Sequence, residues 1–339
     1  MEKAIVFNKT GYDPFITFLK GYAILCVVLA HSVPNIEISG YELWGSMQVP
    51  LFLLIQTFHV FKKDTANLNF KKLWSRIIFP FLILQTTIFA VKLTSAGVSL
   101  QMNVIQILTQ GGYGPGSYYF WVYLQFAVLL PLLHPLVKKW SKKKLLITFL
   151  ICSVTFEIIC SLLHPAEWLY RLLSIRYIFL IYLGFIWVSE GVQMNGMNLF
   201  LSLLSVVAII LFAYVKPNLE PFFYDSGWTT HRWICYFYAA FLLTYLLRLI
   251  WGIVLHCHFV GTVLLVMGKC SYEIYLVQMA VFTLFSKTRL SFIHNGYAQY
   301  AIWFIVAVLC SIIGGILLHR ITNNKYKVIQ ENVKIQSEH

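Results

Sequence analysis

The chain is built from about ten apolar runs, separated by short segments rich in charged residues, Pro and Gly. A helix needs about 20 apolar residues to cross a bilayer, and most of these runs approach that length. Only 12% of the residues are charged, whereas soluble domains carry roughly 25%. We therefore predict an all-α, polytopic membrane protein with about ten transmembrane helices in a single membrane-embedded domain, residues 1–339. The predicted spans are 15–33, 44–61, 77–94, 117–137, 145–163, 174–190, 197–215, 233–251, 259–286 and 297–319.

Two stretches near the C-terminus depart from this pattern. The ninth run contains Gly268 and Lys269, so we expect a shorter helix preceded by an interfacial segment. Residues 323–339 are polar, and we expect them to form a frayed tail.

The net charge of +13 is concentrated in clusters of Lys and Arg between the apolar runs. The clusters fall at 62–76, 138–144 and 320–334, and an even number of spans puts all three on one side. The positive-inside rule makes that side cytoplasmic, together with both termini. The charge therefore indicates a lipid bilayer as partner and no nucleic acid. The cysteines lack metal-ligand spacing such as C-x-x-C, so no metal site is predicted.

The first span contains two ionisable residues, Lys20 and His31. Eleven residues make about three helical turns, which puts both side chains on nearly one face, roughly 16 Å apart along the axis. Ionisable residues inside a span are costly and are read first as functional. His31 suits a neutral general base acting on an alcohol, although a buried His bonded to a neighbouring helix is the alternative. Lys20 either binds a donor or extends to the lipid headgroups.

Two further acids are predicted inside the membrane, Glu157 in the fifth span and Glu273 in the ninth. A buried carboxylate must find a partner or be protonated. Arg171 and Arg176, at the start of the sixth span, are candidate partners. The sequence does not show which acid meets His31.

Three loops carry further candidates. The basic loop with Lys72 and Arg76 suits an anionic nucleotide donor, although the positive-inside rule alone explains its charge. The turn GPGSYY contributes Ser117, Tyr118 and Tyr119, either as part of a tunnel or as a plain loop with an interfacial aromatic anchor. The outer loop DSGWTTHRW suits a carbohydrate, but an ordinary interfacial loop is favoured.

Several of these segments, in this order, resemble the acyltransferase-3 family of integral-membrane O-acyltransferases, and the fucose-O-acetylase-like branch in particular. KGYAILCVVLAH is similar to the family's Arg, ten residues, His motif, with Lys20 in place of Arg. FKKLWSRIIFPFL resembles its basic R-x-x-R segment, where only Arg76 matches. GPGSYYFWVYLQFAVLLPLL and RLLSIRYIFLIYLG resemble its fourth and sixth spans. GKCSYEIYLVQM resembles its GK-x-SY-x-IYL-x-H signature, with Gln278 in place of His.

The resemblance covers about residues 12–320 and implies a bacterial inner-membrane enzyme. It implies acetyl-CoA, or another acyl-CoA, as a cytoplasmic donor and a glycan or glycolipid hydroxyl as acceptor. His31 would be the catalytic base, with a covalent acyl-histidine as the alternative, and Glu157 or Glu273 would orient it or neutralise a cation. The donor would be held by Lys20, Lys72, Arg76, Arg171, Arg176, Ser117, Tyr118 and Tyr119. The protein would act alone, as a homo-oligomer, or with a separate extracytoplasmic transferase.

Two other function classes stay open. A proton-coupled transporter or exporter would also use ten spans, intramembrane Glu and His, and a basic cytoplasmic face. Such carriers often have two related halves with broken helices at matching positions, and the sequence shows neither feature. A membrane scaffold without chemistry would leave His31 and the buried acids unexplained.

Overall fold

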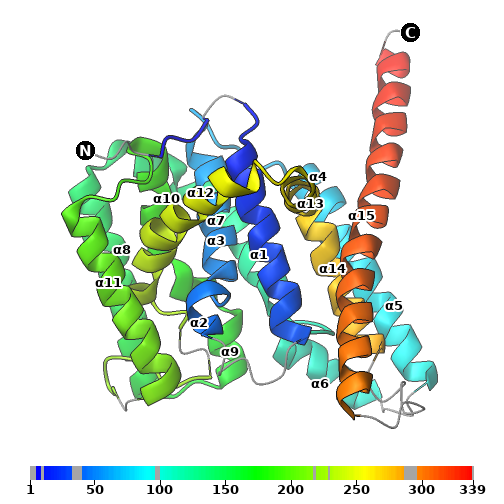
Figure 1. The fold of residues 1–339 in the computed structure, drawn as a ribbon, viewed down its shortest axis with the longest axis horizontal. Coiled ribbons are helices and arrows are strands. Elements are labelled where there is room, and N and C mark those ends of the chain that lie inside the picture. Colours follow the sequence, from blue (N-terminus) through cyan, green and yellow to red (C-terminus); the bar gives the residue numbers. More distant parts are fainter. Residues whose placement is uncertain are drawn as a thin grey trace.

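The computed structural model describes residues 5–8, 11–32, 40–95, 100–216, 219–227, 230–285 and 296–337. In these residues the protein is all-α, and its β pairing is limited to an isolated antiparallel bridge between Ile5 and Val192. Long helices run side by side and form one bundle (Figure 1). This confirms the predicted fold class, an all-α polytopic membrane protein.

Seven helical segments of the described chain are long and apolar enough to span a membrane. They are α1 (Pro14–Ser32), α4–η2–α5 (Phe70–Thr94), α7 (Tyr118–Lys139), α8 (Lys142–Leu163), α11–η4 (Gly196–Val215), η5–η6–α12 (Trp233–Val254) and the apolar part of α15 (Ala298–Thr322). An eighth span is formed if α13 (His258–Lys269) and α14 (Ser271–Leu284) count together, and these two helices are bent by 82° at their junction. The bend confirms that the ninth run is interrupted at Gly268 and Lys269, whereas the interfacial position of its first part stays a prediction.

The two remaining predicted spans are shorter helices. They are α3 (Gln48–Phe61) and the pair η3 (Ser174–Tyr177) and α10 (Phe179–Ser189). All ten apolar runs are therefore helical, but these two fall short of the length of a full span. Three short helices lie in segments expected to be loops or span ends, α2 (Tyr41–Trp44), α6 (Leu100–Gln110) and α9 (Glu167–Leu172).

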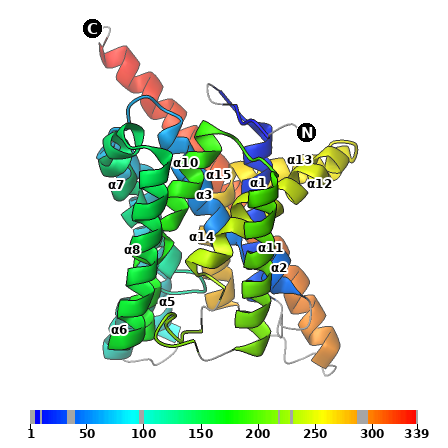
Figure 2. The ribbon, with the colours of Figure 1, turned by 90° about the vertical axis from the view of Figure 1, so that its left-hand side faces the viewer.

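The C-terminal helix α15 (Gly296–Ser337) continues well beyond its apolar part. The expectation of a frayed tail from residue 323 is therefore wrong for residues 323–337. This segment contains no Gly or Pro to end the helix, and it includes three Lys, two Gln and one Glu, which have good helix propensity. In Figures 1 and 2 it projects from the bundle.

The bundle has two distinct ends. The start of α1, the short helix α4 and the end of α15 lie at one end, together with the bridge at Ile5, whereas α6 and α9 lie at the other, with α2 in the half of the bundle nearer to them (Figures 1 and 2). Because α4 carries Lys71 and Lys72, we name the first end the basic end and the second the outer end. Both termini of the described chain are at the basic end, as the predicted topology requires.

Helix α1 lies at the centre of the bundle and packs against α3, α13 and α14. Its contact with α13 is backbone against backbone, through Gly21 and Gly268. A Cβ on Gly21 would lie 2.0 Å from the carbonyl oxygen of Leu264, and a Cβ on Gly268 would lie 1.9 Å from that of Thr17. Only glycine allows this approach. The contact therefore fixes the part of α1 that carries Lys20 against α13.

Candidate functional site

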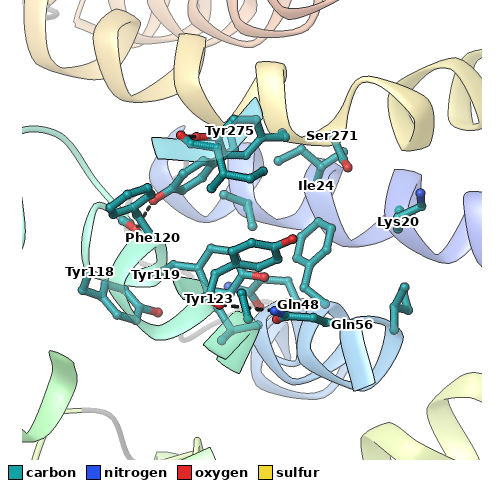
Figure 3. A pocket seen from close by; sticks show the side chains of 18 of the residues that line it. Lys20, Ile24, Gln48, Gln56, Tyr118, Tyr119, Phe120, Tyr123, Ser271 and Tyr275 are labelled. Atoms are coloured by element: carbon teal, nitrogen blue, oxygen red, sulfur yellow. Dashed lines mark hydrogen bonds between the residues drawn. The ribbon is translucent and has the colours of Figure 1, made fainter. Parts of the chain in front are cut away.

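A cavity of about 1150 Å³ lies between α1, α3, α7 and α14. Figure 3 shows side chains from these four helices around it. Along α3 its lining extends from Gln48 at the outer end to Val60 near the basic end, a helical rise of about 18 Å. The cavity therefore extends through much of the bundle toward both ends.

One face of α1 forms a wall of this cavity. Lys20, Ile24, Val27 and His31 all line it, at the spacing of three and four residues that defines one face of a helix. Lys20 lies toward the basic end and His31 toward the outer end. The two ionisable residues of the first span therefore face one space from different depths.

Positive charge gathers in the part of the cavity near the basic end. Lys20, Lys63, Lys72 and Arg76 line it there, together with His59. Among the described acidic residues only Glu42 lines the cavity, and it belongs to α2 at the outer end. A polyanion is therefore favoured at the basic end.

The position of Arg76 follows from the local sequence. Pro80 has no N–H to donate to the carbonyl of Arg76, so the regular α-helical pattern cannot continue there. The N–H of Phe79 instead bonds the carbonyl of Trp74, and Trp74–Ile78 forms the π-helical segment η2. Such segments are frequent at functional sites, and this one carries Arg76 into the cavity wall.

The loop of residues 111–117, between α6 and α7, lies beside His31. A Cβ on Gly116 would lie 3.5 Å from Nε2 of His31. Gly114 and Gly116 have φ values of +91° and +81°, in the left-handed region that glycine adopts without strain. The loop backbone can therefore approach the imidazole closely.

Side chains of α5 and α14 hold this loop in place. The Gln85 amide donates to the carbonyl of Tyr113 and accepts from its N–H, over 3.2 and 2.6 Å. The Tyr275 hydroxyl donates to the carbonyl of Gly116 over 2.9 Å, and Nε2 of Gln278 donates to that of Pro115 over 3.0 Å. The segments GPGSYY and GKCSYEIYLVQM, far apart in the sequence, thus meet beside His31.

The His31 ring is half-buried and meets the Phe282 ring edge-on, with 6.4 Å between their centroids. Within the described residues, no hydrogen bond is made by either ring nitrogen. An imidazole that faces a cavity without a protein partner can take a proton from a bound hydroxyl.

Glu157 lies away from His31 and outside the cavity lining. The residue is 1% exposed, and its carboxylate accepts from the Tyr170 hydroxyl over 2.7 Å and from the N–H of Tyr224 over 3.4 Å. The charges of Arg176 and Arg232 act on it as well. Glu157 is therefore placed to neutralise a cation, and the structure does not bring it to the imidazole.

Arg176 is buried in the same cluster. Its Nη2 donates to the carbonyl of His231 over 3.2 Å, and its guanidinium lies 4.5 Å from the centroid of the Tyr170 ring. The Tyr236 hydroxyl donates to the same His231 carbonyl over 2.8 Å. Arg176 thus holds the outer loop against η3 and does not line the cavity.

His231 connects this cluster to the outer end of the cavity, which it lines. Its Nε2 must donate to the carbonyl of Ser46, 2.8 Å away, so its Nδ1 accepts from the Tyr177 hydroxyl at 3.1 Å. Burial, reinforced by the charge of Arg176, lowers the pKa of His231 to about 3. The ring is therefore neutral and acts as a structural link near neutral pH.

The remaining predicted site residues are divided among three places. Tyr118 and Tyr119 line the main cavity (Figure 3). Arg171 and Ser117 line a smaller, neighbouring cavity instead. Glu273 forms an ion pair of 2.9 Å with His319 of α15, so it links two helices outside the cavity lining.

Several residues of the cavity wall were not predicted as site residues from the sequence. His59 and Lys63 line the basic end, and Gln48, Gln56 and Tyr123 line the middle and the outer part. A signal exists for His59, because positions 48, 52, 55, 56 and 59 of α3 repeat at helical spacing and all line the cavity. For Tyr123 the sequence offers only an aromatic residue within an apolar run.

The arrangement combines cationic side chains at the basic end, a long cavity and, toward its outer end, an imidazole that has no hydrogen-bond partner among the described residues. It suits a polyanionic donor with a long flexible arm whose far end reaches His31, and within the described residues no cluster of His, Cys, Asp and Glu could hold a metal ion. The acyltransferase-3 family model, described as an acyltransferase domain, matches residues 13–320. Comparisons with curated proteins and with solved structures give no match. The chain belongs to the acyltransferase-3 family and is a membrane acyltransferase.

Proposed function

We propose that the protein transfers an acyl group, acetyl in the first instance, from cytoplasmic acyl-CoA to a hydroxyl of a lipid-linked or cell-surface glycan. Its place would be the inner membrane of a bacterium, with the basic end in the cytoplasm. One observation carries the proposal: a single cavity extends from four cationic side chains at the basic end to His31 near the outer end. Donor and acceptor can therefore meet inside the membrane from opposite sides.

The cations at the basic end would hold the phosphates of the donor. Lys20, Lys63, Lys72 and Arg76 surround the same space, and charge-assisted hydrogen bonds to phosphate are among the strongest available to a protein. The pantetheine arm would then extend along the α1 face toward His31, about 16 Å farther. Ile24, Val27 and Phe52 contribute apolar side chains to this part of the wall, which would limit the access of water to a thioester.

His31 would act as the general base. The neutral imidazole takes the proton of the acceptor hydroxyl as its oxygen attacks the thioester carbonyl, and the C–S bond then breaks. The imidazolium returns the proton to the leaving CoA thiolate, so the products are the ester and free CoA. Proton transfer of this kind contributes about 10²- to 10⁴-fold to a rate.

The test is release of free CoA by the purified protein in nanodiscs, with acetyl-CoA and a crude glycolipid extract. We expect His31→Ala to lower turnover at least 100-fold, with acetyl-CoA binding unchanged. The matched control is His256→Ala, because His256 is exposed, lies outside the cavity lining and has its ring bonded to the Gly252 carbonyl four residues earlier. This control should keep wild-type turnover.

Two outcomes would overturn the proposal. Equal loss in both variants would mean that the effect is structural and that His31 has no special role. Absence of thioester consumption by the wild type, combined with accumulation of a labelled solute in proteoliposomes, would favour the transporter interpretation.

A further inference from the structure

A second cavity, of about 360 Å³, lies on the other side of the 111–117 loop from His31. Gly116 and Tyr118 line both cavities, so the two spaces are separated by little more than the loop backbone. Phe282, which meets the His31 ring, also lines the smaller cavity. A group bound in the second cavity would therefore lie close to the imidazole.

This second cavity carries positive charge at the end of the bundle opposite the four cations of the main cavity. Lys92 of α5 and Arg171 of α9 line it, and no described acidic residue does. The other polar groups of its wall are amides and hydroxyls, among them Gln106, Gln110 and Thr283. Such a wall favours an anion that also accepts hydrogen bonds.

Both cations are held in place by aromatic rings at the ends of the loop. The Lys92 ammonium lies 4.7 Å from the centroid of the Tyr113 ring, and the Arg171 guanidinium lies 5.5 Å from that of Tyr118. Cation–π contact fixes a charge in position without neutralising it. Across the described chain, no ion pair is formed by Lys92.

The backbone that carries Arg171 is fixed as well. The side chain of Gln125 in α7 donates to the carbonyl of Leu172 over 2.8 Å and accepts from the N–H of Ser174 over 3.1 Å. Gln85 fixes Tyr113 in the same two-way manner from α5. The two cations are therefore preorganised in the wall of one cavity, which lowers the entropic cost of binding a ligand there.

We propose that this second cavity binds an anionic group of the acceptor, a phosphate or a carboxylate, while a hydroxyl of the same sugar unit reaches His31 past Gly116. The proposal rests on the proposed function, and it narrows the acceptor class to acidic or phosphate-linked glycans. The donor phosphates and the acceptor anion then occupy two basic sites at opposite ends of the molecule. The charged group would hold the acceptor in register with the base.

The first experiment does not depend on turnover. Binding of radiolabelled inorganic phosphate is measured in phosphatidylcholine nanodiscs, with saturating CoA to occupy the basic end. We expect saturable binding that weakens about tenfold in Arg171→Gln and in Lys92→Gln, since each removes a charge-assisted contact. Arg171→Lys keeps the charge and should retain most of the phosphate binding. Lys216→Gln is the matched control, because this exposed cation lies at the same outer end and lines neither cavity.

A lipid arm separates the two sources of phosphate. The measurement is repeated in phosphatidylglycerol nanodiscs. If the anionic lipid abolishes phosphate binding by the wild type, a headgroup occupies the site and the acceptor assignment is overturned. Binding that is equal in the wild type, Arg171→Gln and Lys92→Gln would mean an adventitious ion only, and it would overturn the site itself.

A turnover arm tests the acceptor class. The glycolipid extract is split by anion exchange into neutral and acidic pools, and CoA release is followed with each. We expect activity with the acidic pool, an acceptor KM about tenfold higher in the Gln variants, and an unchanged KM for acetyl-CoA. Activity confined to the neutral pool would overturn the proposal. Absence of turnover with either pool, despite phosphate binding that depends on Arg171, would refute the proposed function alone.

Discussion

The molecule buries ionisable side chains in two regions that differ in one respect. Around Glu157, Arg176 and His231, each side chain has protein partners at hydrogen-bonding distance. Around Lys20 and His31, the side chains face a cavity. Removing one partner of a buried charge destabilises the fold, because the other group is left uncompensated, whereas a charge that faces open space is available to a ligand. Burial of a charge alone therefore does not identify a catalytic residue.

The largest effect that would test this comparison is expected at Arg176. Arg176→Met leaves Glu157 with less compensating charge and leaves the His231 carbonyl with fewer donors, which should cost about 3–5 kcal/mol of stability. Turnover per folded molecule should stay near the wild-type value. Thermal unfolding in detergent, with CoA release measured on the folded fraction, checks both. An unchanged Tm with lost turnover would move Arg176 into the catalytic machinery.

Acidification should act on the same cluster. Because the pKa of His231 lies near 3, below its usual 6.5, the unfolded chain takes up a proton between these pH values while the folded one does not. The contribution of His231 to the free energy of unfolding is therefore fully present above pH 6.5. It falls as the pH drops, by about 2 kcal/mol at pH 5 from this group alone. We expect His231→Gln to lose less stability than the wild type between pH 7.5 and pH 5, measured as Tm.

The control for that measurement is His256→Gln, whose side chain is exposed. It should follow the wild-type pH dependence. The same pH dependence in His231→Gln and in the wild type would show that another group is responsible.

Substitution of a cation in the cavity wall should affect substrate binding and leave stability nearly unchanged, the reverse of the result expected at Arg176. Lys20→Met removes one of the cations at the basic end and should raise the KM for acetyl-CoA about tenfold, equivalent to about 1.4 kcal/mol, with little effect on Tm. Lys20→Arg should keep most of the affinity. Steady-state kinetics at two salt concentrations check this. A large drop in Tm with unchanged KM would place Lys20 among the structural charges.

The smallest effect is expected at Glu273. Its ion pair with His319 is partly exposed, and pairs of this kind contribute about 0–1 kcal/mol. Glu273→Gln should therefore shift stability by less than about 1 kcal/mol and leave CoA release within twofold of wild type. A 100-fold loss of turnover would reinstate Glu273 as a catalytic residue.

Much of the fold was predictable because membrane helices leave a strong signal. All ten apolar runs are helical, and the interruption at Gly268 and Lys269 marks the bend between α13 and α14. The alignment of Lys20 and His31 follows from helical geometry alone. The length of α15 was missed because polarity was read as disorder, although helix propensity favours continuation of the helix there.

The site was less predictable because partners depend on tertiary packing. The sequence marked Glu157 and Glu273 as buried acids, but Tyr170 and His319, which meet them, come from other helices. In the same way, nothing local to Gln278 indicates that it holds the 111–117 loop beside His31. An ionisable residue in an apolar run is visible in the sequence as an energetically unfavourable one. Whether protein partners or a ligand stabilise it depends on the tertiary fold.

The close crossing of α1 and α13 has a consequence for directed evolution of this enzyme. Any side chain at Gly21 or Gly268 would collide with main-chain atoms of the opposite helix. In a library screened only for product, variants at these two positions would appear as inactive as variants at His31, although neither glycine lines the cavity. Pairing such a screen with a readout of folded protein in the membrane would separate the two classes, and diversity aimed at new donors belongs on the cavity-facing positions of α3 and α7.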